Sequence, residues 1–169
     1  MRAADVFIAI PAFLLLITVL TIYGSNLVLL LVFLGLIAWP GTARLVRSEI
    51  LSLRSRDFVT AALVVGASGP RIVLRHLLPN VVPVIVVAAT LRVATLILLE
   101  ASLSFFGLGV QPPTATWGNM VSDGRGLLDS AWWITTLPGS LIVVTVLAIN
   151  FIGDGLRDAL DPRRRSLTE

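Results

Sequence analysis

Cysteine and lysine are absent from the 169-residue sequence, and histidine occurs once, as His76. Without cysteine there is no disulfide or thiolate metal site, and one histidine excludes a multi-histidine metal centre. The sequence also lacks a glycine-rich loop followed by lysine, the pattern that holds ATP phosphates, and a serine–histidine–acid arrangement for hydrolysis. Any ATP that this protein uses must therefore be bound by another polypeptide.

The chain has few charged residues and several long apolar runs. Charged residues make up 14% of the chain, against about a quarter in a soluble domain. Hydrophobic residues make up 56%, and the mean hydropathy is +0.94. A helix needs about 20 apolar residues to cross a bilayer. Four runs meet or approach this length, at residues 6–23, 26–46, 81–106 and 131–152. The sequence predicts an all-α polytopic membrane protein with about four transmembrane helices.

The first run is interpreted as a membrane span and not as a signal peptide. Asp5 borders it, Pro11 lies inside it, and no small-residue cleavage site follows. The second and fourth runs contain Pro40 and Pro138, which membrane helices tolerate where neighbours satisfy the freed carbonyls.

The arginines are distributed unevenly between the runs. Six lie between residues 44 and 79, four more lie between residue 157 and the C-terminus, and only Arg125 lies in segment 108–130. By the positive-inside rule, segment 44–79 and both termini are expected to be cytoplasmic. This topology explains the net positive charge of the chain, so no nucleic-acid partner is expected.

Three tryptophans near segment 108–130 favour anchoring at the opposite membrane interface, with substrate contact as the alternative: Trp117, Trp132 and Trp133.

The segment 54–80 interrupts the apolar runs. Its pattern predicts a helix that begins near Asp57 and ends at Gly66, because glycine followed closely by proline is a helix stop signal. A second short helix, 71–77, is expected to end at Pro79. Small residues at positions 61, 62 and 66 allow another backbone to approach. An amphipathic connector lying in the membrane interface fits the residues equally well.

Arg92 and Glu100 are charged residues inside the third run, where charges are costly and usually functional or paired. Eight residues separate them, about 80° around a helix, so they do not stack on each other. Partners on other helices are expected. A role in the substrate pathway or in helix packing remains open for both, with packing favoured for Glu100.

Three stretches resemble the permease subunits of bacterial ABC importers. Residues 59–80 read VTAALVVGASGPRIVLRHLLPN, similar to the cytoplasmic signature of two alanines, a glycine four residues later and a Leu-Pro pair. Residues 98–120 read LLEASLSFFGLGVQPPTATWGNM, and residues 150–163 read NFIGDGLRDALDPR. Together they resemble the dipeptide/oligopeptide/nickel permease family, in particular its C-type second permease subunit. The resemblance runs from about Arg2 to Arg163.

This resemblance implies the type I permease fold of ABC importers. It implies a permease domain at 1–157, a cytoplasmic coupling segment at 54–80 and a basic cytoplasmic tail at 158–169. The protein would be a transport subunit without enzymatic activity, moving di- or oligopeptides by alternating access. The resemblance implies these ATPase-coupling residues: Asp57, Ala61, Ala62, Gly66, Leu78 and Pro79.

The implied partners are ATP-binding subunits that carry ATP and magnesium, a second homologous permease and an extracytoplasmic substrate-binding protein. The chain itself is expected to bind no cofactor and to lie among the lipids of a bacterial or archaeal cytoplasmic membrane. Family members usually have about two further spans upstream of the stretch that matches Met1. This difference motivates an alternative expectation, a truncated, non-transporting remnant or scaffold.

Overall fold

The computed structural model describes residues 1–160, and every regular element in that range is helical. The elements are α1 (Arg2–Ala9), α2 (Ala12–Tyr23), α3 (Leu27–Arg54), α4 (Asp57–Val64), α5 (Gly69–Ile72), η1 (Val73–Leu77), α6 (Leu78–Phe105), α7 (Trp117–Gly124), η2 (Arg125–Leu127), α8 (Leu128–Ala131) and α9 (Trp133–Leu160). The predicted all-α class is confirmed. Within this range three helices are long and apolar enough to cross a membrane, or four if the bent pair α1–α2 counts as one span.

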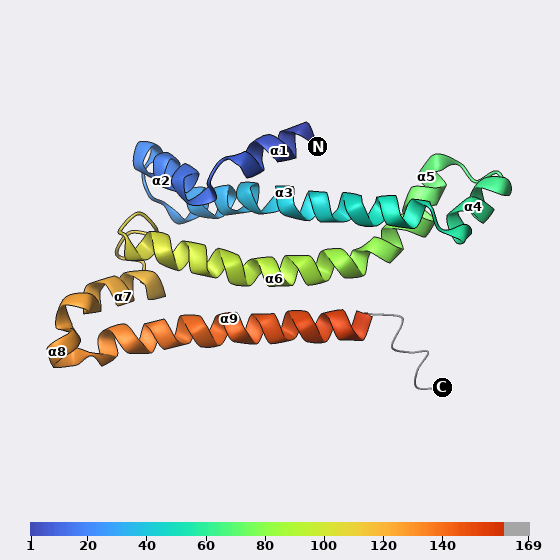
Figure 1. Ribbon diagram of the computed structural model, residues 1–169. Helices are drawn as coiled ribbons and strands as arrows, with labels where there is room; N and C mark the ends of the chain where they lie inside the picture. The colour runs from blue at the N-terminus through green and yellow to red at the C-terminus, as the bar shows by residue number, and fades with distance from the viewer. Residues whose placement is uncertain (161–169) are drawn as a thin grey trace.

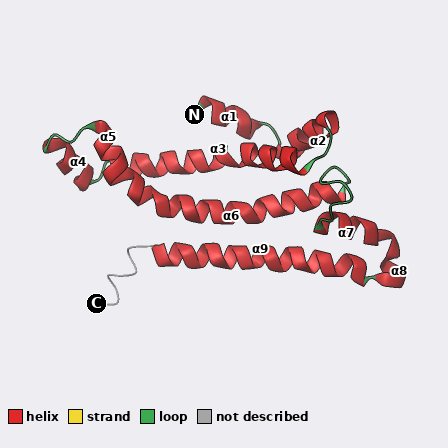
Figure 2. Cartoon of the chain, turned by 180° about the vertical axis from the view of Figure 1, so that it is seen from behind, coloured by secondary structure: helices red, strands yellow, loops and turns green. Residues whose placement is uncertain are grey.

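The three long helices lie side by side in one layer, with α6 between α3 and α9 (Figure 1). Helices α1 and α2 lie against α3, and α2 also packs on the C-terminal end of α6. Helices α4 and α5 lie at one end of the layer, together with the C-terminal end of α9, and α7 and α8 lie at the other (Figure 2). These are called the α4 end and the α7 end. At most 17% of any spanning window is buried, so the long helices leave most of their apolar surface available to lipid or partner chains.

The first expected span is broken. Helices α1 and α2 meet at an angle of 80°, and Ile10 and Pro11 between them have extended backbone angles. Proline has no N–H to donate, and its ring crowds the carbonyl four residues earlier, so Pro11 ends one helix and precedes the next. The span expected over residues 6–23 is therefore bent at Pro11 in the structure. Asp5 on α1 accepts a hydrogen bond from Arg44 Nη2 on α3 at 2.6 Å, which ties α1 to the side of α3.

The long helices extend beyond the apolar runs at the α4 end. Helix α3 continues past residue 46 to Arg54, and α9 continues to Leu160, so no helix boundary separates residues 157 and 158. Most of the proposed tail, from residue 161 onward and including its run of three arginines, lies outside the described residues.

The second short helix does not end at Pro79, contrary to the sequence expectation. Residues Gly69–Phe105 form one continuous helix that passes through the π-helical turn η1, where the Leu78 N–H donates to the Val73 carbonyl. The wider π-helical turn accommodates Pro79, which is the second residue of α6 and has no N–H to donate. The Asn80 side-chain amide donates to the His76 carbonyl at 2.6 Å and so satisfies one acceptor at the irregular turn.

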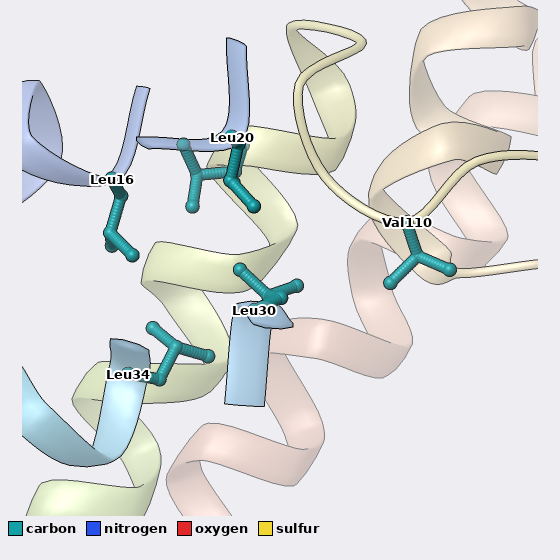
Figure 3. Packing of buried hydrophobic residues seen from close by; sticks show 6 residues of the cluster. Leu16, Leu20, Leu30, Leu34 and Val110 are labelled. Carbon is teal, nitrogen blue, oxygen red and sulfur yellow. The ribbon is translucent and has the colours of Figure 1, made fainter. Parts of the chain in front are cut away.

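The main apolar core lies near the α7 end (Figure 3). Its buried side chains come from α2, α3, the C-terminal half of α6 and the loop after it: Leu16, Leu20, Leu30, Leu34, Leu103 and Val110. Two polar contacts support the same end. The Asn26 side chain caps α3 by accepting from Leu29 N at 2.7 Å, and Ser25 Oγ donates to the Leu108 carbonyl at 3.0 Å.

Helix α7 packs closely on the end of α6 because Gly118 has no side chain. A Cβ at Gly118 would lie 2.7 Å from Ser104 Cβ and would overlap the Ala101 carbonyl oxygen. We expect Gly118→Val to force α7 away from α6 and to lower the midpoint of thermal unfolding in detergent by several degrees. Gly126→Val is the matched control, because a Cβ at Gly126 meets no atom within 4 Å. Equal midpoints for the two variants would contradict this packing.

Candidate functional site

Helix α4 is a short helix that lies at the end of the layer and outside the long helices (Figure 1). It begins after Arg56, whose side chain makes no cap, and Asp57 occupies its first turn. The exposed Asp57 carboxylate lies at the positive end of the helix dipole, which favours a helix start at this point. Eight residues are too few for a stable isolated helix, so α4 depends on tertiary contacts and on its termini.

One face of α4 is held by a small apolar cluster, here called the anchor cluster. Val59 of α4 is 2% exposed and packs with Ile72 and Leu77 of the α5–η1 segment. Residues from the C-terminal end of α3, from α4 and from the turn after it complete the cluster: Ile50, Leu53, Ala62 and Ala67. The anchor cluster fixes α4 to both α3 and the start of the α6 helix, so a force on α4 acts on two spans.

Gly66 makes the turn that ends α4, as the sequence predicted, with φ of +83°. The Gly66 N–H donates to the Leu63 carbonyl at 2.9 Å, and the Ala67 N–H donates to the Ala62 carbonyl at 3.0 Å. These two bonds form a Schellman motif, in which the residue after the cap adopts the left-handed conformation that favours glycine. The glycine is required by its backbone angle and not by space, because a Cβ there would meet no atom within 4 Å.

The other face of α4 is apolar and uncovered. Leu63, Val64 and Val65 are 57%, 82% and 88% exposed, and Phe58 and Ala61 are also exposed. Ala62 differs from the sequence expectation, because it packs toward the anchor cluster and does not share the exposed face with Ala61. Consecutive exposed aliphatic residues outside the spans suit contact with a protein partner. The exposed side chains of residues 63–65 were missed by the sequence reasoning, although three large apolar residues before a helix-ending glycine could have indicated them.

Leu78 and Pro79 lie at the start of α6 and both are exposed. They do not lie on α4 but follow the η1 turn, whose Leu77 belongs to the anchor cluster. The coupling role of the six residues taken from the family signature stays a prediction.

Arg92 and Glu100 both lie on α6 and are half-buried. Glu100 Oε1 accepts a hydrogen bond from Ser104 Oγ at 2.6 Å, and Ser104 is 1% exposed. The partner of Glu100 is therefore one turn along its own helix and not on another helix, which corrects the expectation. Arg92 lies against Gly41 of α3, and within residues 1–160 its guanidinium has no hydrogen-bond or ion-pair partner.

Comparison with known proteins defines the class. The family model described as "Binding-protein-dependent transport system inner membrane component" matches residues 1–166. The oligopeptide transport system permease protein OppC of Salmonella typhimurium is 44% identical over 165 residues, 98% of this chain and 55% of its own length. OppC of Haemophilus influenzae is 42% identical over 98% of this chain and 53% of its own length. A Brucella ovis protein named as a peptide permease is 47% identical over 96% of this chain and 55% of its own length.

The chain belongs to the family of binding-protein-dependent transport system inner membrane components, which is the type I permease family of ABC transporters. Its similarity to oligopeptide and peptide permeases extends over nearly all of its length. The chain spans about half the length of these curated relatives.

Proposed function

We propose that this chain acts as a permease subunit of an ATP-binding-cassette importer for di- or oligopeptides in the cytoplasmic membrane. The relatives named as oligopeptide permeases support the substrate class. In this proposal the α4 end faces the cytoplasm and the α7 end faces the opposite side, where a substrate-binding protein delivers peptide. A second homologous permease completes the pathway, and separate ATP-binding subunits carry ATP and magnesium.

The uncovered apolar face of α4 is the observation that carries this proposal. Leu63, Val64 and Val65 project from a helix whose opposite face is fixed by the anchor cluster to α3 and to the α6 helix. A partner protein that binds this face of α4 would move α3 and the α6 helix together. This arrangement supports transmission of movement from an ATPase subunit to the membrane helices, and with it alternating access driven by ATP.

Uptake by the reconstituted transporter tests the function. The chain, in its full-length native context, is incorporated into proteoliposomes with the second permease, the ATPase subunits and the binding protein. We expect a radiolabelled tripeptide to accumulate with ATP and not with a non-hydrolysable analogue. Accumulation that is independent of ATP, or absent although all subunits are assembled, would overturn the proposal.

A membrane scaffold that does not transport is not favoured by the similarity to peptide permeases. Affinity purification from the native host after gentle solubilisation separates the two functions, because a permease subunit should bring an ATPase and a second permease with it. Recovery of the chain without an ATPase would favour the scaffold.

A further inference from the structure

An arginine-lined pocket lies between the middles of two long helices. Arg92 is 14 residues from the start of α6 and 13 from its end, and Gly41 has the same position in α3. Both residues lie within the apolar runs 26–46 and 81–106. The pocket has a volume of about 210 Å³ and is lined by Gly41, Thr42, Leu45, Ala88, Leu91, Arg92 and Thr95.

The positive charge of Arg92 is not neutralised by the described part of the chain. Within residues 1–160 no hydrogen bond or ion pair joins Arg92 to an acidic side chain, and Glu100 and Asp5 are engaged with Ser104 and Arg44. A guanidinium within a span is costly unless it meets an anion or water. Because Gly41 has no side chain, the guanidinium lies close to α3 at the wall of the pocket. Thr42 and Thr95 add hydroxyl groups to the same lining.

The pocket therefore presents a cation and two threonine residues in an otherwise apolar wall, between the middles of α3 and α6. A planar carboxylate matches a guanidinium, which donates two parallel hydrogen bonds to it. The volume is sufficient for a carboxylate with one small residue and not for a whole oligopeptide. We propose that the Arg92 pocket receives the C-terminal carboxylate of a peptide during its passage, an inference that rests on the proposed function.

A pair of peptides that differ only in this group tests the inference. Uptake of trialanine and of trialanine amide is measured in proteoliposomes holding the complete transporter, with native Arg92 or with Arg92→Met. Arg92→Met should lower uptake of the free acid roughly 10- to 100-fold more than uptake of the amide, the range expected for a lost charge-assisted hydrogen bond. Because both transporters use the same binding protein, its own preference cancels in the ratio. Arg125→Met, at the α7 end, is the matched control and should leave the ratio unchanged.

An equal loss for both peptides would overturn the proposal and assign Arg92 to a protein or lipid anion, and no loss for either peptide would also overturn it. If the native transporter moves neither peptide, the proposed function fails. Binding of the two radiolabelled peptides to the solubilised complex then decides the inference separately: Arg92→Met should abolish a preference for the acid, and equal binding of both peptides to the native complex would refute it.

Discussion

Replacing Gly66 with valine should reduce ATP-dependent uptake at least tenfold while membrane insertion remains normal. Gly66 has φ of +83°, a region in which a β-branched residue is strained by about 1–3 kcal/mol. That strain acts on the two hydrogen bonds that end α4, and an eight-residue helix has few other bonds to compensate. The exposed face of α4 would then lose its fixed orientation toward a partner. Uptake in proteoliposomes and the amount of inserted protein are the two measurements.

A graded series separates backbone strain from bulk at this position. Asparagine tolerates the left-handed conformation better than other non-glycine residues, so Gly66→Asn should retain much of the uptake that Gly66→Val loses. Gly126→Val introduces the same side chain into open space at the opposite end, without a left-handed backbone, and should transport normally. Equal loss in Gly66→Asn and Gly66→Val would show that the backbone angle is not the cause.

The second large effect is expected from a charge on the uncovered face of α4. Val64 is 82% exposed, so Val64→Asp should not disturb the fold. If an ATPase subunit covers this face, the substitution places an unpaired carboxylate in an apolar contact, which costs several kcal/mol. We expect the ATPase to be lost from the purified complex and ATP-dependent uptake to fall to background. Subunit stoichiometry after affinity purification measures the loss.

Leu127→Asp is the control for that substitution. Leu127 is also an exposed aliphatic residue, but it lies at the α7 end, far from α4. It should leave the amount of co-purified ATPase unchanged. An ATPase that remains with Val64→Asp in the normal ratio would mean that α4 is not its docking site.

The sequence predicted the helical class and the placement of α4 well, because both follow from local signals. Apolar length indicates spans, and glycine followed by proline indicates the end of α4. Irregular backbone was predicted less well. The sequence analysis placed Pro11 inside the first span and took Pro79 as a helix end, yet the chain bends at the first and passes through the second in a π-helical turn. Which outcome a proline gives depends on whether neighbouring groups satisfy the freed carbonyls, which are not visible in the sequence.

Side-chain direction at the candidate site could not be read from the signature. Ala61 and Ala62 are adjacent in sequence, but the helical rotation of about 100° between them turns one outward and the other into the anchor cluster. The same limit applies to Glu100. Its bond to Ser104 follows a helical i,i+4 spacing that the sequence contains, whereas the burial of Ser104 depends on the approach of Gly109 and Gly118 from later in the chain.

Site-specific cross-linking from α4 tests the central claim most directly. Residues 1–169 contain no cysteine, so Val64→Cys and Leu127→Cys each introduce the one thiol of this segment. Each variant is assembled into the transporter and treated with a short thiol-to-amine cross-linker, and the products are identified by mass spectrometry. If α4 couples the permease to its ATPase, Val64→Cys gives an adduct with the ATP-binding subunit and Leu127→Cys gives none. The absence of an ATPase adduct from Val64→Cys in a complex that still transports would contradict the account.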